Sequence, residues 1–330
     1  MFTKSKSVAQ RLFVCATLAL AMGSGAFAGE YDSFPTKPVK IIVSFAAGGS
    51  MDALARFVGA ELEKKWGQPV LVENREGAGG RIGGIAVARS APDGYTLGGG
   101  TNAFVQQGSM DPDSFNPARD LMVLTIAGTS SYSFAVPSSS KFNSIADLVE
   151  ASKTSLVLFG SSGIGSGAHF AGEMLNSATG AQMKHVPYKG DALAITALST
   201  GEIHAIFASP PSLRPSVEAG NAKVLGVASR ERMAQFPDTP TMDEAGVKGF
   251  EMPTFWAFWA PKGLPEALAD KLADDINAAL ETPRVREAVT NTLGLIPVPR
   301  APRKDHDKFV ADELESFSRV AKEIGIQKKN

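Results

Sequence analysis

The strongest constraint on the fold is a local pattern that occurs twice: a short apolar strand, a loop rich in glycine and serine, and the start of a helix. In the first copy, the β-branched run at 39–45 leads into Ala46-Ala47-Gly48-Gly49-Ser50 and a helix with apolar spacing at 51–65. In the second copy, a strand at 156–159 leads into the loop 160–167. Such units are typical of parallel sheets with crossover helices.

The same alternation continues along the chain and predicts an α/β protein. We expect further strands at 70–73, 95–97, 184–186, 203–207, 224–228 and 255–260, and helices at 145–153, 168–178, 191–200, 212–219, 265–281 and 303–324. Ser144 with Asp147, and Thr241 with Glu244, have the spacing of capping boxes, which mark helix starts.

The first 28 residues have the layout of a signal peptide. Three cations between Lys4 and Arg11 precede an apolar run at 12–22, and Ala26-Phe27-Ala28 supplies the small-residue pattern before a cut at Gly29. An apolar run of this length is too short for a bilayer span of about twenty residues. We therefore expect residues 1–28 to be cleaved and the rest of the chain to be exported.

Charge and cysteine content exclude several classes of function. Without residues 1–28, which hold three cations and no acids, 30 Lys and Arg face 34 Asp and Glu over 302 residues. A net charge of −4 argues against nucleic-acid binding. The only cysteine, Cys15, leaves with the signal peptide, which excludes disulfides and Cys-based zinc sites.

The two Gly/Ser-rich loops have the chemistry of an anion site. Glycine lets the backbone approach a ligand closely, and a helix start offers unpaired N–H groups. Neither loop carries Lys or Arg, which favours a small carboxylate over a polyphosphate. The run 163–168 fits a dinucleotide pattern formally, but the next strand ends at Tyr188-Lys189 without the acid that would hold a ribose. We expect no cofactor.

The sequence gives only weak evidence for a catalytic nucleophile or a metal site. Ser162 lacks the second glycine of a G-x-S-x-G nucleophile motif, and the four histidines do not fall at metal-ligand spacings. His169 stays a candidate ligand contact because it follows the second loop by one helical turn. The aromatic run 255–259 is interpreted as a buried strand rather than a wall that stacks on a ligand.

Six ordered motifs then give the chain a resemblance to a known family. They are Phe45-Ala46-Ala47-Gly48-Gly49-Ser50-Met51-Asp52, Val72-Glu73-Asn74-Arg75 with Gly77-Ala78-Gly79-Gly80, Ala91-Pro92-Asp93-Gly94-Tyr95-Thr96-Leu97, Gly160-Ser161-Ser162-Gly163, His185-Val186-Pro187-Tyr188-Lys189-Gly190, and Pro240-Thr241 with Glu244 and Gly246. This sequence resembles the Bug (TctC-like) family, the periplasmic solute receptors of tripartite tricarboxylate transporters. Departures from the family pattern at Ser44, His204 and 153–155 lie outside the two loops.

The resemblance implies a two-domain periplasmic-binding-protein fold of type II, which closes on its ligand like a flytrap. Each domain would be a mainly parallel sheet flanked by helices. Domain 1 would comprise 29–130 plus 254–330, and domain 2 would comprise 131–253. Hinges are expected near 129–132 and 252–256.

The resemblance also assigns site residues by position. Asp52, an acid in the first helical turn, would brace the first loop. The expected ligand contacts are Phe45, Ala47, Gly48, Gly49, Ser50, Thr101, Asn102, Ser161, Ser162, Gly163, Ser166, His169 and Ser209.

The implied function is non-enzymatic capture of a small organic carboxylate in the periplasm and its delivery to integral membrane permease subunits. The protein is expected to be a monomer that binds no metal. Two alternatives stay open: a ligand sensor for a membrane kinase, and an exported hydrolase or isomerase that uses the same cleft. Aromatic acids, aliphatic dicarboxylates, nicotinate-like acids and amino acids all stay open as ligands.

Overall fold

The computed structural model describes residue 31 and residues 33–327, and the predicted signal peptide at 1–28 lies outside the described residues. Backbone contacts divide the chain into two compact units, Met1–Thr36 and Lys37–Asn330, and every helix and strand below belongs to the second. No helix within the described residues is long and apolar enough to cross a membrane.

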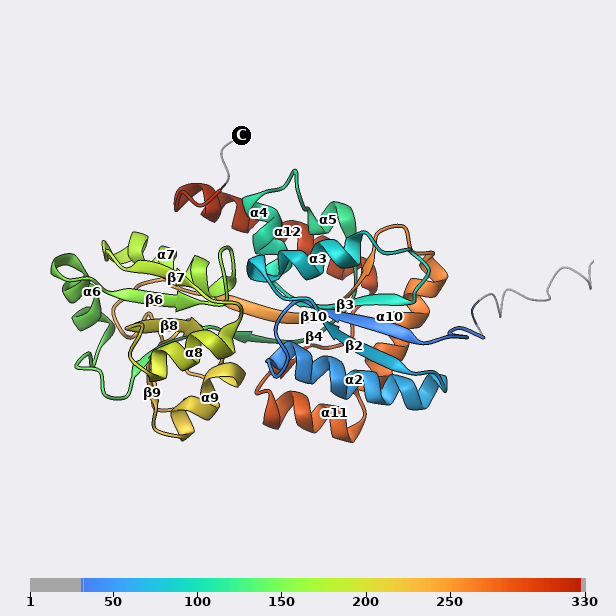
Figure 1. The fold of residues 1–330 in the computed structure, drawn as a ribbon, viewed down its shortest axis with the longest axis horizontal. Helices are drawn as coiled ribbons and strands as arrows, with labels where there is room; N and C mark the ends of the chain where they lie inside the picture. Colours follow the sequence, from blue (N-terminus) through green and yellow to red (C-terminus); the bar gives the residue numbers. More distant parts are fainter. Residues whose placement is uncertain (1–30, 32, 328–330) are drawn as a thin grey trace, which may run out of the picture. The chain divides into compact units, whose positions relative to one another are not determined.

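A six-stranded sheet with the order β11-β4-β10-β3-β1-β2 forms what we call the first lobe (Figure 1). Its strands are β1 (Val39–Val43), β2 (Val70–Asn74), β3 (Thr96–Thr101), β4 (Leu121–Ser131), β10 (Pro253–Pro261) and β11 (Ile296–Pro297). Its helices are α2 (Ser50–Trp66), η1 (Ala78–Gly80), α3 (Arg81–Ala88), α4 (Ala103–Met110), α5 (Pro117–Asp120), α10 (Glu266–Leu280), α11 (Pro283–Glu287), η2 (Ala288–Thr292) and α12 (Arg303–Glu323).

A five-stranded sheet with the order β7-β6-β8-β5-β9 forms the second lobe. Its strands are β5 (Ser133–Pro137), β6 (Leu158–Ser161), β7 (Lys184–Pro187), β8 (Ala205–Ala208) and β9 (Ala222–Val227). Its helices are α6 (Ile145–Thr154), α7 (Gly167–Thr179), α8 (Asp191–Ser199) and α9 (Pro210–Glu218), and they lie on both sides of the sheet (Figure 1).

Both sheets are mixed, whereas the sequence predicted mainly parallel ones. β1 pairs in parallel with β2 and β3, and β6 pairs in parallel with β7 and β8, as the strand–loop–helix units predicted. β10 and β5 pair antiparallel with their neighbours in the sheet. The reason is that the chain passes from one lobe to the other along β4 and β5 and returns along β10, in the opposite direction.

The sequence missed β4, β5 and α4 because nearly all of their residues are buried and give no alternating pattern. The two predicted capping boxes both form. Ser144 and Asp147 exchange hydrogen bonds at the start of α6, whereas Thr241 and Glu244 exchange theirs around a turn that does not continue as a helix.

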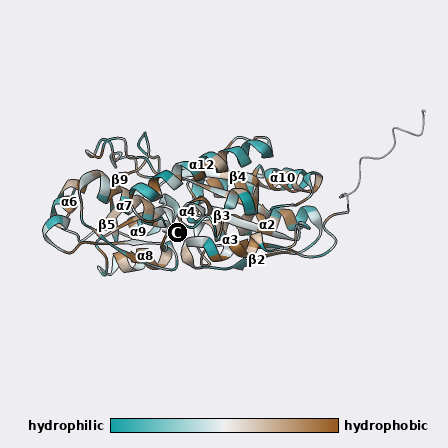
Figure 2. Cartoon of the chain, turned by 90° about the horizontal axis from the view of Figure 1, so that it is seen from above, coloured by the Kyte–Doolittle hydropathy of each residue, from teal (hydrophilic) through white to brown (hydrophobic). Residues whose placement is uncertain are grey.

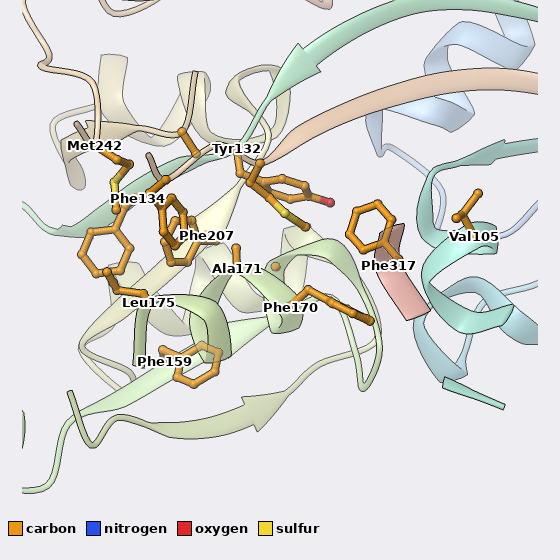
Figure 3. Packing of buried hydrophobic residues seen from close by; sticks show 14 of the residues in the cluster. Val105, Tyr132, Phe134, Phe159, Phe170, Ala171, Leu175, Phe207, Met242 and Phe317 are labelled. Atoms are coloured by element: carbon orange, nitrogen blue, oxygen red, sulfur yellow. The ribbon is translucent and has the colours of Figure 1, made fainter. Parts of the chain in front are cut away.

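The buried core is continuous from one lobe to the other. Phe317 of α12 meets Phe170 of α7 edge to face, with ring centroids 5.4 Å apart, and the two rings point toward each other in Figure 3. Figure 2 shows the opposite character on the outer surfaces, where α10 and α12 carry many hydrophilic residues. The C-terminal helix therefore packs on the first lobe and also contacts the second.

Candidate ligand-binding cleft

The loop that joins β1 to α2, residues 45–50, is held in place by one buried carboxylate. Asp52 accepts hydrogen bonds from the Gly48 N–H at 3.0 Å, from Asn74 at 3.0 Å and from Arg56 at 2.9 Å. Burial alone would raise the pKa of Asp52, but the bonds from Arg56, Gly48 and Asn74 outweigh burial and lower it. The ionised side chain thus joins the loop to α2 and β2, and its role in bracing the loop for a ligand stays a prediction.

The end of the same loop is joined to the central strand of the first lobe. The Trp256 indole donates from Nε1 to Ser50 Oγ at 3.0 Å, and Trp256 lies opposite Thr101 in the β10–β3 register. The N-cap of α2 is Gly49, whose lack of a side chain leaves the first N–H groups of the helix without a side-chain cap. Those groups are suited to an anion.

The second loop, residues 160–167, is organised largely by bonds within itself. Ser161 Oγ lies 3.1 Å from the Gly163 nitrogen and 2.6 Å from His185 Nε2. Ser166 caps α7, and His169 Nδ1 accepts from the Gly165 N–H at 3.1 Å. These side chains are turned toward the interior of the second lobe.

His169 and His185 stack on each other, with ring centroids 4.0 Å apart. Burial lowers the pKa of His169 to about 4. Burial, with a further contribution from His169, lowers the pKa of His185 to about 3. Both rings are therefore neutral at pH 7 and act as hydrogen-bonding parts of the loop.

A cavity of about 320 Å³ lies between the first loop and the second lobe, where Ser162 of the second loop is joined by residues at the starts of α8 and α9. The carboxyl ends of the parallel strands of both lobes meet there, which is where open α/β sheets bind ligands. Its lining is Phe45, Ala46, Gly48, Gly49, Ser50, Met51, Ala53, Thr101, Tyr132, Ser162, Lys189, Gly190, Asp191, Ala192, Leu193, Ser209, Pro211, Ser212, Pro215, Thr254, Trp256, Thr292 and Leu293.

Seven of the residues predicted as ligand contacts line this cavity: Phe45, Gly48, Gly49, Ser50, Thr101, Ser162 and Ser209. Six others lie outside the lining, and their role in binding stays a prediction: Ala47, Asn102, Ser161, Gly163, Ser166 and His169. Asn102, for example, is fully buried and ties β3 to β10, because it accepts from Thr254 at 2.6 Å and donates to the Pro253 carbonyl.

Sequence reasoning missed several lining residues. Ser212 follows Ser209 by three residues, and their hydroxyl oxygens lie 3.0 Å apart at the start of α9. The serines that follow β8 could have been predicted as ligand contacts, because β8 ends at the same edge of its sheet as the strand that precedes the second loop. Tyr132 and Thr254, by contrast, enter the cavity from the segments that cross between the lobes, and no local pattern marks them.

Aromatic residues of β10 differ in their exposure to the cavity. Trp256 is among the lining residues, whereas Trp259 packs against Phe104 with ring centroids 5.4 Å apart. Within the described residues, no group of three or more His, Cys, Asp or Glu side chains is placed to hold a metal ion.

The chain is similar in sequence and in fold to known proteins. Residues 54–326 match the family described as the tripartite tricarboxylate transporter family receptor, TctC. Among solved structures, the periplasmic binding protein BugD is 30% identical, with a TM-score of 0.84 over 90% of this chain and 100% of BugD. This similarity shows a type II periplasmic-binding-protein fold.

Two further solved structures hold carboxylates. Rpa4515 of R. palustris, solved with adipate, is 29% identical, with a TM-score of 0.82 over 88% of this chain and 98% of its own. MatC of Rhodopseudomonas palustris, solved with bound malate, is 28% identical, with a TM-score of 0.82 over 87% of this chain and 99% of its own.

Proposed function

The chain belongs to the tripartite tricarboxylate transporter receptor family, and on that premise we propose that it captures a small organic carboxylate and delivers it to the permease subunits of such a transporter. The family is one of binding proteins rather than enzymes. The observation that carries the proposal is the cavity between the first loop and the second lobe, with the uncapped start of α2 on one side and the Ser162 and Ser209 hydroxyls on the other.

Neutral donors suit a carboxylate in a protein of net negative charge. Backbone N–H groups at a helix start and serine hydroxyls attract an anion locally, without help from the charge of the whole molecule. Adipate and malate, which the two relatives hold, are carboxylates of a size suited to a cavity of about 320 Å³. Aliphatic carboxylates are therefore the first class to examine.

Capture would occur by closure of two domains, 29–130 plus 254–330 and 131–253. The lobes are joined where β4 runs into β5 and where the chain enters β10. Tyr132 and Met252 lie side by side there, with the Tyr132 N–H donating to the Met252 carbonyl at 3.1 Å. A ligand that touches both loops favours the closed state, because only that state brings both loops to it.

Export to the periplasm is part of the proposal. BugD is a periplasmic binding protein, and the N-terminal 28 residues have the signal-peptide layout. N-terminal sequencing of the exported chain, expected to begin at Gly29, tests this part.

Thermal-shift screening of a carboxylate library on the mature protein tests the binding function. A ligand that binds only the native state raises the melting temperature. We then expect Ser162→Ala to weaken binding about 5–30-fold by calorimetry, the equivalent of one lost hydrogen bond of about 1–2 kcal/mol. Its melting temperature without ligand should fall only slightly, although Ser162 also lies beside the Asp191 carboxylate.

Ser138→Ala is the matched control, since Ser138 is an exposed serine of the second lobe outside the cavity lining. An unchanged affinity in Ser162→Ala would contradict the assigned site. A library with no stabilising carboxylate would contradict the function itself.

A further inference from the structure

One acidic side chain lies among the residues that line the cavity. Asp191 is the first residue of α8, directly after Gly190, and it is partly buried. The remaining lining side chains are apolar or carry a hydroxyl or indole group, except for Lys189, which is exposed to solvent. A carboxylate is unexpected in a site proposed to hold an anion, so its surroundings bear on what the ligand is.

Asp191 lies close to both sides of the cleft. The Ser162 and Ser212 hydroxyls lie near its carboxylate and act to lower its pKa. A Cβ atom placed on the neighbouring Gly190 would lie 3.8 Å from the Ala46 Cβ, so this part of the second lobe reaches the first loop. A ligand that touches the first loop and Ser162 therefore has Asp191 beside it.

The charge on Asp191 is poorly compensated. Burial raises its pKa, and the Ser162 and Ser212 hydroxyls offset burial only in part. Its charge also contributes, after burial, to a raised pKa of the Tyr132 phenol. Asp191 has no salt bridge within the described part of the chain.

A simple carboxylate ligand would add to the uncompensated negative charge of Asp191. It would place a second negative charge in the same cavity of about 320 Å³, where like charges disfavour each other more strongly than in open water. A cationic group on the ligand would compensate both carboxylates at once. A protonated amine also supplies N–H donors to the acceptor oxygens of Asp191, in the strong charge-assisted class of hydrogen bond.

We propose that Asp191 is a specificity-determining residue that accepts a hydrogen bond from a protonated amine of the ligand, so that the site takes an amino-acid-like carboxylate. The inference rests on the proposed function and names its substrate class. The carboxylate of the ligand faces the start of α2 and the amine faces Asp191. Bare dicarboxylates and hydroxy acids of the same length bind more weakly, because they leave the charge of Asp191 uncompensated.

Matched ligand triads that differ at one substituent test the inference by calorimetry on the mature protein. We would use aspartate, malate and succinate; glutamate, 2-hydroxyglutarate and glutarate; and phenylalanine, phenyllactate and phenylpropionate. In the triad that fits the cavity, the amine-bearing member should bind at least about tenfold more tightly than the other two, as expected for a charged hydrogen bond. Asp191→Asn should reduce this preference to about threefold or less.

Asp191→Asn is expected to fold with a melting temperature at or above that of the wild type, since it removes a buried charge and keeps an acceptor for the two serines. Glu150→Gln is the matched control, because Glu150 is an exposed acid of the second lobe outside the cavity lining. It should leave the preference intact.

Three results overturn the inference. The first is that an amine-free carboxylate of the triads or the library binds more tightly than every amine-bearing one. The second is that Asp191→Asn keeps the wild-type preference. In both of these cases the proposed carboxylate function stands. In the third, no carboxylate of any kind binds, and the proposed function fails together with the inference.

Discussion

His169 and His185 illustrate how single residues shape the cleft without lining it. His169 accepts a hydrogen bond from the Gly165 N–H, and His185 is hydrogen-bonded to Ser161. The stacked rings therefore support the second loop without lining the cavity. Neutral histidine suits this role, because each ring offers one donor and one acceptor nitrogen. The sequence identified His169 by its place one turn after the loop, but it could not pair it with His185, which is contributed by β7.

The histidine pair predicts a loss of stability in mild acid. The pKa values of both rings lie below the ordinary value near 6.5, at about 4 and about 3, so the unfolded chain binds more protons below pH 6.5. The stability that the pair contributes is present above pH 6.5 and is lost as the pH falls toward the folded-state values. Between pH 6.5 and 4.5 the loss should be roughly 2–4 kcal/mol.

Urea unfolding at several pH values measures this effect. The double variant His169→Asn with His185→Asn, which keeps polar groups at both positions, should be less stable at pH 7. Its stability should nevertheless fall less steeply than that of the wild type below pH 6.5. If the free energy of unfolding falls equally steeply with decreasing pH in both proteins, the histidine pair does not cause the loss of stability.

At the scale of elements, the connection from β1 to α2 depends on Asp52. Its carboxylate is nearly inaccessible, whereas the side chain of its ion-pair partner Arg56 is 53% exposed. An exposed partner contributes little, about 0–1 kcal/mol, because solvent screens the pair. The bonds from Gly48 and Asn74 join the carboxylate directly to the loop and to β2, so they should matter more to the shape of the loop.

We therefore expect Asp52→Ala to lower the free energy of unfolding by about 1–3 kcal/mol and to weaken ligand binding, since the Gly48 N–H loses its acceptor. Arg56→Met should cost less than about 1 kcal/mol. Chemical denaturation and calorimetry of both variants provide the comparison. Equal losses in the two would mean that the ion pair, and not the bond to the loop, stabilises this connection.

For the whole molecule, the two lobes also touch beside the cavity, at a contact between α4 and the second loop. Gln107 Nε2 donates to the Ile164 carbonyl at 2.7 Å, and Gln107 lies outside the cavity lining. Gly79 comes so close that a Cβ atom there would lie 2.6 Å from the same carbonyl oxygen. The opening of the lobes proposed above would break this contact.

Gln107→Ala should consequently weaken ligand affinity about fivefold although it removes no cavity-lining group, because closure loses one hydrogen bond of about 1 kcal/mol. Small-angle X-ray scattering should show a smaller radius of gyration with saturating ligand than without it. Gln182→Ala, at an exposed glutamine of the second lobe, is the control. An unchanged radius, or an affinity equal to that of the wild type, would argue against closure at this contact.

Local patterns in the sequence were enough to predict the fold class, the family and the strand ends at which a site should form. These depend on local periodicity, on glycine-rich turns and on ordered motifs, which are all local features of the amino-acid sequence. Gly48, Ser162 and Asp52 lie within such motifs, so their positions in the chain were enough to single them out.

Which side chains face the cavity could not be predicted from local patterns and follows from the folded structure. Ser161 and Ser162 are adjacent in the sequence, but one is turned to His185 and the other lines the cleft. Asp191 and Tyr132 join the site from elements that no local pattern connects to the loops. The direction of a side chain follows from contacts within and between the lobes, and those contacts join residues far apart in the sequence.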